Sequence, residues 1–271
     1  MKIDFYKYHG TGNDFIIIED PDKGFIKSQT SPEKFINLLC NRRFGIGADG
    51  LILLQNSSKY DFSMKYYNSD GSEGSMCGNG GRCIAAFAKH KGIGGNRLTF
   101  EAIDGEHDVI IEKNSLVKLK MQDVLAYQKI GKSFLINTGS PHYIKFVKNN
   151  KSINVIKEGS KIRNDKKYSS EGVNVNFVEL KNNLLLVRTF ERGVEDETLS
   201  CGTGVVASAI AAYLNGVKKP ATGFKIITKG GELKVSFSIN QQSGIIENVW
   251  LKGPAKFVYK GTIDLNDLNL K

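Results

Sequence analysis

Alternating apolar and polar residues mark several strand-length segments of the chain. Residues 115–121 alternate in this way, and residues 62–67 and 184–190 are rich in strand-forming side chains. A period of two is typical of half-buried antiparallel strands. Two runs of small apolar residues, 83–90 and 205–214, instead predict helices, and each is soon followed by a glycine. The pattern therefore predicts an α+β fold with mostly antiparallel strands and two prominent helices.

The chain also repeats itself. Three short motifs occur twice, and their copies lie 124 to 127 residues apart. The copies are Cys77-Gly78-Asn79-Gly80 with Cys201-Gly202-Thr203-Gly204, Gly105-Glu106 with Gly231-Glu232, and Gly12-Asn13 with Gly139-Ser140. This nearly constant separation predicts two homologous halves, residues 1–122 rejoined by 260–271, and residues 123–259. We expect each half to be a mostly antiparallel sheet wrapped around a central helix, with pseudo-symmetry and an active site in the cleft between the halves.

Composition and charge narrow the classes of function. The chain has 271 residues and a net charge of +10, but its lysines are scattered and do not interleave with aromatic residues, so nucleic-acid binding is not favoured. The polar start and the lack of an apolar run of about 18 residues predict a cytoplasmic protein without a membrane span. The four cysteines contain no C-x-x-C pair, so we expect reduced thiols and no metal site.

Two of the cysteines have a setting that suits chemistry. Cys77 and Cys201 each precede a predicted helix and are followed by glycines. The positive end of a helix can lower the pKa of a thiol from about 8.5 to about 3.5–7.5, and the glycines let backbone amides approach an anion. One acid/base group on each side of a carbon is what inversion of a stereocentre requires. For Cys40 and Cys83 we favour packing roles, because Cys40 follows apolar residues and Cys83 has no repeat partner.

Seven motifs, in order along essentially the whole chain, resemble the diaminopimelate epimerase family. They are HGTGNDF at 9–15, RFGIGADG at 43–50, NSDGSE at 68–73, MCGNGGRC at 76–83, GVNV at 172–175, ERG at 191–193 and ETLSCGTG at 197–204. The resemblance implies an enzyme that interconverts LL- and meso-diaminopimelate on the route to lysine and peptidoglycan. It also implies that no cofactor is used, that the only partner besides this small-molecule substrate is a second copy of the chain, and that the protein is a homodimer.

The resemblance further implies roles for particular residues. Cys77 and Cys201 would be the two acid/base groups, and His142 and Glu191 would tune their pKa values. The residues implied to bind substrate are Asn13, Asn68, Gly78, Asn79, Ser140, Asn174, Glu191, Arg192, Gly202 and Thr203. We expect Asn13, Asn68, Asn174 and Arg192 to hold the distal amino-acid end, because amides and a guanidinium can recognise an ammonium and a carboxylate. The backbone amides of Gly78, Asn79, Gly202 and Thr203 would instead face the carboxylate at the reacting centre.

Two positions depart from the family pattern, and two other interpretations stay open. Ser140 replaces a usual asparagine and can make one of its contacts, whereas Gly50 replaces a polar residue of some members and offers only backbone. A proline or hydroxyproline racemase of the same fold would share the chemistry but bind a compact ring. A thiol redox or binding module would use the cysteines without epimerisation. We also expect His90 and His107 to lie on the surface.

Overall fold

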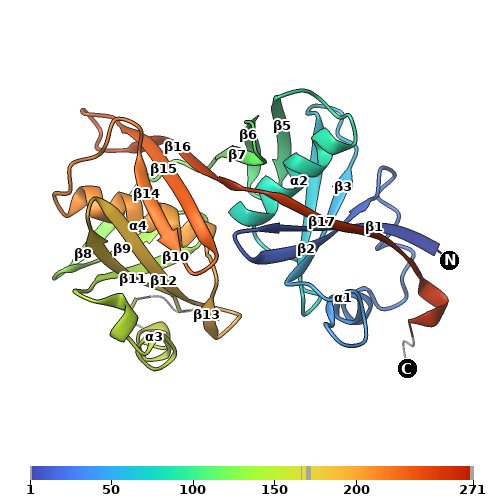
Figure 1. Cartoon of the computed structure of the whole chain (residues 1–271), viewed down its shortest axis with the longest axis horizontal. Coiled ribbons are helices and arrows are strands. Elements are labelled where there is room, and N and C mark those ends of the chain that lie inside the picture. The colour runs from blue at the N-terminus through green and yellow to red at the C-terminus, as the bar shows by residue number, and fades with distance from the viewer. Residues whose placement is uncertain (1, 166, 169–171, 269–271) are drawn as a thin grey trace. The chain divides into compact units, whose positions relative to one another are not determined.

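The computed structural model describes residues 2–165, 167–168 and 172–268 and divides the chain into two compact units. Unit 1 comprises Met1–Leu119 and Pro254–Lys271, and unit 2 comprises Lys120–Gly253. The chain returns to unit 1 at Pro254 rather than at the expected residue 260. The reason is that the whole last strand, β17 (Lys256–Asp264), pairs with the first strand, β1 (Lys2–Gly10) (Figure 1).

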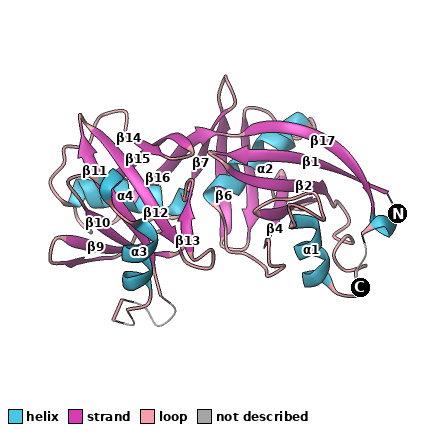
Figure 2. Ribbon diagram, turned by 60° about the horizontal axis from the view of Figure 1, so that its bottom comes forward, coloured by secondary structure: helices cyan, strands magenta, loops and turns pink. Residues whose placement is uncertain are grey.

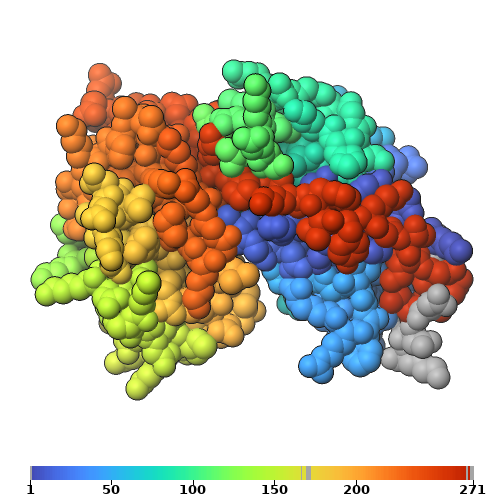
Figure 3. Space-filling view, in the orientation of Figure 1, coloured from blue at the N-terminus to red at the C-terminus, as the bar shows by residue number. Residues whose placement is uncertain are grey.

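The strands of unit 1 form one sheet. Among the described residues its order is β17-β1-β2-β3-β4-β5-β6-β7. The remaining strands are β2 (Asn13–Glu19), β3 (Gly50–Gln55), β4 (Phe62–Asn68), β5 (Arg97–Ala102), β6 (Gly105–Ile111) and β7 (Leu116–Lys120). Figure 2 shows β17, β1 and β2 side by side, and in Figure 3 the red residues of β17 cover the surface beside the blue residues of β1.

Unit 2 repeats this order. Its described strands run β8-β9-β10-β11-β12-β14-β15-β16, and the short β13 pairs with β12. They are β8 (Tyr127–Ile130), β9 (Ser133–Asn137), β10 (Pro141–Phe146), β11 (Asn174–Lys181), β12 (Leu184–Glu191), β13 (Asp196–Thr198), β14 (Phe224–Thr228), β15 (Gly231–Ile239) and β16 (Ile246–Pro254). The predicted α+β fold of two similar halves is therefore confirmed.

Each sheet is mostly antiparallel but contains two parallel pairs. In unit 1 these are β2 with β3 and β4 with β5, and in unit 2 they are β10 with β11 and β12 with β14. A helix lies in each of the four connections. A crossover of this kind returns the chain to the same end of the sheet, so the next strand runs parallel. Residue alternation carries no information on strand direction, and these pairs were not predicted.

The central helices are α2 (Gly78–His90) in unit 1 and α4 (Gly202–Leu214) in unit 2. Strands β1, β2, β3, β4 and β6 pack against α2, and β9 to β12, β14 and β15 pack against α4. Both helices begin directly after the cysteine, earlier than residues 83 and 205. Small residues permit this close packing: a Cβ on Gly81 would lie 3.0 Å from the Leu119 side chain in β7, and a Cβ on Gly204 would lie 2.3 Å from that of Asn176 in β11. The first residues of each helix are thereby fixed against the sheet.

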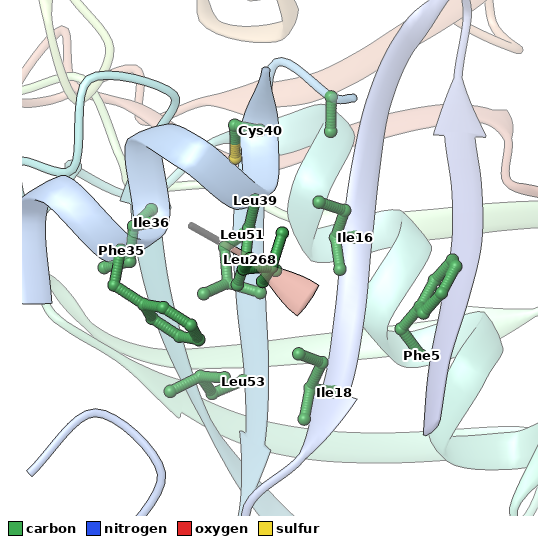
Figure 4. Packing of buried hydrophobic residues seen from close by; sticks show 11 residues of the cluster. Phe5, Ile16, Ile18, Phe35, Ile36, Leu39, Cys40, Leu51, Leu53 and Leu268 are labelled. Atoms are coloured by element: carbon green, nitrogen blue, oxygen red, sulfur yellow. The ribbon is translucent and has the colours of Figure 1, made fainter. Parts of the chain in front are cut away.

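A second helix covers the opposite face of each sheet, and neither helix was predicted. In unit 1, α1 (Pro32–Cys40) buries Phe35, Ile36 and Leu39 against apolar side chains of β2 and β3 (Figure 4). In unit 2, α3 (Val155–Arg163) packs beside β11 and β12. Short 3₁₀ turns occur at η1 (Asn150–Ser152) and η2 (Leu265–Asp267). Each sheet is thus covered on both faces, which explains its nearly continuous apolar strands such as β3.

The structure also tests the predicted surface positions of two histidines. His107 is 1% exposed, stacks on Phe100 and lies 2.9 Å from a carboxylate oxygen of Asp104, so its predicted place on the surface is wrong. His90 is exposed, as predicted. No helix in the described ranges is both long enough and apolar enough to cross a membrane.

Candidate active site

Cys77 is the residue immediately before helix α2. Its backbone is extended, with φ −104° and ψ 118°, and the first helical hydrogen bond runs from the amide of Gly81 to the Cys77 carbonyl at 2.8 Å. The backbone amides of Gly78, Asn79 and Gly80 precede that bond and lie in the first turn of the helix, where N–H groups point along the axis. The thiol is partly exposed. An extended residue followed by three forward-pointing amides gives this end of α2 the character of an anion site.

Side chains from β2 and α2 meet around the Cys77 thiol. Its Sγ lies 3.5 Å from the Oδ1 of Asn13, and the same oxygen accepts a hydrogen bond from the Asn79 amide at 3.2 Å. Arg82 donates to Asn79 Oδ1 at 2.9 Å and to the Gly78 carbonyl at 3.0 Å. Arg82 is fully buried, and burial lowers the pKa of its guanidinium to about 10. A buried cation therefore supports the beginning of α2.

Asn13 is held from its other side by charged residues. Its Nδ2 donates to Asp49 at 2.8 Å, and Arg42 bridges Asp49 and Asp14 with contacts of 2.7 and 2.6 Å. Lys7 completes the cluster by pairing with Asp14 at 2.7 Å. Because the amide nitrogen is engaged by Asp49, Asn13 turns its oxygen toward Cys77 and Asn79.

Asn68 is the last residue of β4 and lies at the same end of the sheet as Asn13. Its side-chain nitrogen donates to Ser72 at 3.1 Å, within the turn that follows the strand. Gly50 pairs with Asn68 across the sheet. A Cβ on Gly50 would lie 2.6 Å from the Tyr66 ring and from the Tyr67 carbonyl, so this position admits no side chain. The departure at Gly50 thus follows from the packing of β4.

Cys201 repeats the backbone geometry of Cys77 at the start of α4. Its φ is −107° and its ψ is 113°, and the amide of Val205 donates to its carbonyl at 2.9 Å. Its Sγ lies 3.5 Å from the hydroxyl of Thr203, whose carbonyl accepts a hydrogen bond from Thr138 at 2.9 Å. Cys201 is 6% exposed, so it is more deeply buried than Cys77.

A network of neutral side chains surrounds Thr203. The Nε2 atom of His142 lies 2.9 Å from the Thr203 hydroxyl and 3.1 Å from that of Ser140. Asn174 donates to the Ser140 hydroxyl at 3.1 Å, and its own carbonyl oxygen accepts the backbone amide of Arg192 at 2.8 Å. Burial, together with the charge of Arg192, lowers the pKa of His142 to about 3, so the imidazole is neutral. Unlike the surroundings of Cys77, this network contains a histidine and no buried arginine.

The site residues that the sequence predicts lie in two groups, one in each unit. Unit 1 brings together Cys77, Asn13, Gly78 and Asn79, with Asn68 at the neighbouring strand end; unit 2 brings together Cys201, Gly202, Thr203, Ser140, His142, Asn174 and Arg192. Glu191 ends β12, directly before Arg192. The roles of these residues in catalysis and binding stay predictions.

Sequence reasoning missed several residues that support these groups. They are Arg82, Arg42, Asn176 and Thr189. Asp49, which accepts a hydrogen bond from Asn13, pairs with Arg42. Only Arg82 had a local signal, because it lies one turn after Gly78 on a helix that is apolar at most other positions.

The other two cysteines are packing residues. Cys40 and Cys83 are both buried. Burial raises the pKa of Cys40 to about 12 and raises that of Cys83 still further. Neither therefore offers a thiolate near neutral pH. In the part of the chain that the structure describes, no three or more His, Cys, Asp and Glu residues are grouped so that they could hold a metal ion.

Comparisons with known proteins connect these groups to a family. The sequence profile of diaminopimelate epimerase matches residues 5–125 and 134–258. The diaminopimelate epimerase of Flavobacterium psychrophilum is 49% identical over 97% of this chain and 100% of its own length. That of Aquifex aeolicus is 39% identical over 96% of this chain and 98% of its own length.

Solved structures with little sequence identity share the fold. A phenazine biosynthesis protein of the PhzF family from Bacillus anthracis has a TM-score of 0.75 at 17% identity, covering 97% of this chain and 99% of its own. A probable proline racemase from Agrobacterium radiobacter, with bound carbonate, has a TM-score of 0.74 at 14% identity, covering 99% of this chain and 94% of its own. These likenesses extend over both units.

Proposed function

Because the chain belongs to the diaminopimelate epimerase family, we propose that it converts LL-2,6-diaminopimelate to meso-diaminopimelate by a two-cysteine acid/base reaction without a cofactor. The observation that carries this proposal is the occurrence, once in each unit, of a thiol at a helix start with almost identical backbone geometry. A single such thiol would suit many reactions. Two of them, in repeated settings, suit removal of a proton from one face of a carbon and delivery to the other.

In the proposed reaction one cysteine is a thiolate and the other a thiol. The thiolate takes the α-hydrogen as a proton and becomes a thiol, while the electron pair of the broken C–H bond moves toward the substrate carboxylate. The second cysteine donates its proton to the opposite face of the same carbon and becomes a thiolate. Substrate and product thus differ only in configuration, and the net proton count of the two thiols is unchanged.

The α-hydrogen is a very weak acid, so the charge that develops on the carboxylate must be stabilised. The amides that open α2 and α4 supply donors for this purpose, those of Gly78 and Asn79 in unit 1 and those of Gly202 and Thr203 in unit 2. Donors that are already fixed by packing need no reorganisation as the charge forms. They would replace the electron sink that pyridoxal phosphate provides in other racemases.

We assign recognition of the distal amino-acid end to Asn13, Asn68, Asn174 and Arg192. Amide groups and a guanidinium suit an ammonium and a carboxylate that lie several bonds from the reacting carbon. Ser140 would contribute a single hydroxyl contact, and Glu191 would stabilise the reacting ammonium. A compact substrate such as proline would leave several of these polar groups without partners, which is costly in a closed site.

The chemistry of the product suggests the biological setting. Meso-diaminopimelate is a precursor of lysine and of peptidoglycan, so we place the enzyme in that biosynthesis, in the cytoplasm. We further propose that it acts as a homodimer, as the family resemblance implies.

One assay tests the central proposal. Purified reduced protein is incubated with LL-diaminopimelate in deuterium oxide, with no cofactor added, and the meso product and its α-deuterium are measured. We expect conversion with solvent deuterium in the product. Turnover of L-proline instead would support a racemase of the same fold, and rapid disulfide exchange without any epimerisation would support a redox module. Either result would overturn the assignment.

A further inference from the structure

A chain of buried polar side chains extends behind Cys201. Thr189 donates to the Oδ1 of Asn176 at 2.9 Å, and the Nδ2 of Asn176 lies 3.1 Å from the Nδ1 of His142. His142 Nε2 lies 2.9 Å from the Thr203 hydroxyl, which lies 3.5 Å from Cys201 Sγ. Asn176 and His142 are completely buried, and the other three residues are at most 9% exposed. These five side chains, from β12, β11, β10 and the start of α4, thus form a continuous row of contacts that ends at the Cys201 thiol.

Hydrogen-bond polarity gives this chain a direction. Because the Thr189 hydroxyl donates to Asn176 Oδ1, the side-chain nitrogen of Asn176 faces His142. An unprotonated Nδ1 of His142 then accepts a hydrogen bond from that nitrogen. The remaining proton of the imidazole then lies on Nε2, which can donate to the hydroxyl oxygen of Thr203 at 2.9 Å or of Ser140 at 3.1 Å. The Thr203 hydroxyl keeps its own proton, and that proton is available to Cys201.

Near neutral pH the His142 imidazole is uncharged, so only its tautomer can vary. It is fully buried, and its burial and the charge of Arg192 lower its pKa to about 3. The groups that contact it from neighbouring elements are the hydroxyls of Ser140 and Thr203 and the amide of Asn176, all of them neutral. Of these, only Asn176 contacts Nδ1 through a group that can donate but not accept. Asn176 is therefore the residue that selects between the two neutral forms.

Unit 1 shows that the fold does not require polar residues at these positions. The register of the parallel strands pairs Phe15 with Gly50 in unit 1 and His142 with Asn174 in unit 2. By the same register Ile52 is the counterpart of Asn176. Both Phe15 and Ile52 are buried and apolar. A polar network inside a sheet costs stability unless it is fully satisfied, so its presence in unit 2 alone indicates a role other than folding.

The glycine that ends each cysteine motif fits the same contrast. A Cβ on Gly80 would lie 3.1 Å from the end of the Ile52 side chain, whereas a Cβ on Gly204 would lie 2.3 Å from Asn176 Oδ1 and 3.2 Å from the His142 ring. The start of α4 therefore packs directly on the Asn176–His142 pair. This packing holds both side chains in place beneath Thr203.

We propose that Asn176, anchored by Thr189, is a positioning residue that holds neutral His142 with its proton on Nε2, so that Thr203 presents a hydroxyl proton to Cys201 and stabilises its thiolate. The inference rests on the proposed function only in taking Cys201 to exchange a proton with substrate. A neutral donor stabilises the thiolate moderately. An imidazolium would stabilise it more strongly and weaken it as a base.

Two variants of Asn176 distinguish positioning from packing. Asn176→Asp replaces the donor with a carboxylate of nearly equal size and should draw a proton to His142 Nδ1, giving an imidazolium. Asn176→Leu removes the donor and lets His142 Nε2 accept from Thr203. The pH at which half of Cys201 reacts with iodoacetamide should fall in the first variant and rise in the second, each by about one unit. In both variants kcat should fall.

Matched controls isolate the effect. Ser208→Ala removes a buried hydroxyl that donates to the Gly204 carbonyl at 2.7 Å, on the same helix but outside the chain of side chains. It should lower the unfolding midpoint without moving the Cys201 profile. Thr189→Ser should behave as wild type, because it keeps the hydroxyl. Cys77, followed by mass spectrometry in the same samples, should react alike in all of these proteins.

Nitrogen NMR of His142 in the wild-type protein gives a direct answer even if a variant does not fold. The chain has four histidines, so the His142 signals can be assigned. We expect an unprotonated Nδ1 and a protonated Nε2 at neutral pH. A protonated Nδ1 in wild type, or Cys201 profiles that shift in the same direction in both Asn176 variants, would overturn the inference. Expected NMR and alkylation results without epimerisation of diaminopimelate would overturn the proposed function alone.

Discussion

The two cysteine settings share a backbone but differ in what supports it. Cys77 and Cys201 precede helices of equal length, with φ and ψ values that agree within about five degrees. Behind Cys77 lies a buried guanidinium, Arg82, whose counterpart in unit 2 is Val206. Behind Cys201 lies the neutral imidazole of His142, whose counterpart in unit 1 is Phe15.

This difference shows how a duplicated fold can supply two unequal groups. The repeated backbone gives both thiols a helix end and a set of amides. The unrepeated side chains then adjust each thiol separately, through a fixed cation in one unit and an orientable hydroxyl in the other. A reaction that inverts a carbon needs one acid and one base at any moment, so unequal support is compatible with the proposed chemistry. Four experiments test this difference between the two thiols, from the largest expected effect to the smallest.

Removing either thiol should have the largest effect. We expect Cys77→Ala and Cys201→Ala each to lower kcat by about 10²–10⁴-fold or more, while KM changes little, because the loss lies in the chemical step. Each variant retains one thiol and should wash deuterium into only one epimer, and the two variants should prefer opposite epimers. Cys40→Ala is the matched control and should keep its kcat.

If both single variants incorporated deuterium into the same epimer, the proposed difference between Cys77 and Cys201 would be wrong. That outcome would mean that the two thiols do not address opposite faces of the carbon. Substantial epimerisation by the double alanine variant would exclude both thiols from the reaction.

Acid should affect the two units differently. The folded-state pKa of His142 is lowered to about 3, below the usual value of about 6.5. The unfolded chain therefore binds more protons between these values, and the stability that depends on neutral His142 falls as the pH falls from about 6.5. This loss amounts to about 3 kcal/mol at pH 4.5.

In unit 1 one acid-sensitive group is Asp14. Although burial raises its pKa, hydrogen bonds from Arg42 and Lys7 lower it to about 2. Its contribution to stability is therefore present above about pH 4 and lost only between about pH 4 and 2. Hydrogen exchange at pH 7 and at about pH 4.5 should show unit 2 losing protection first. His142→Phe, which installs the residue found at position 15, should remove this early loss; earlier opening of unit 1 would contradict the assignment.

The buried cation should act on Cys77 alone. In Arg82→Met the positive charge behind α2 is lost, so the pH at which half of Cys77 is alkylated should rise by about one unit, and kcat should fall about tenfold. Arg82→Lys keeps a charge without the fork and should lie between this variant and wild type. The alkylation profile of Cys201 should not move in either variant. Equal shifts at both cysteines would mean that the substitution perturbs the whole protein rather than one thiol.

The parts of this comparison that are local in sequence were predictable, and the parts that join distant segments were not. The helix starts could be located because cysteine, glycines and the apolar run are adjacent, although the helices begin several residues earlier than expected. The supporting contacts join Asn176 to His142 across 34 positions and Asn13 to Asp49 across 36, and neither asparagine has a local feature that marks its partner. Helix α1 has nine residues, too few for its amphipathic pattern to stand out from a loop. Its role is visible only where it meets the outer face of the sheet.

The smallest effect is expected at Asn13 and Ser140, two equivalent residues that we propose bind substrate. In Ser140→Ala one hydroxyl is lost, and the affinity for substrate should fall by about 0.5–1.5 kcal/mol with little change in kcat. Asn13→Ala should cost more, because the Asn13 amide is fixed in place by Asp49 and Asn79, whereas the Ser140 hydroxyl is shared among His142, Thr203 and Asn174. Titration of both variants with substrate measures this difference. Ser140→Asn, which installs the residue found at position 13, should bind substrate at least as well as wild type. If Ser140→Ala leaves affinity unchanged, the hydroxyl serves the His142 network rather than substrate, and recognition in unit 2 then depends on Asn174 and Arg192.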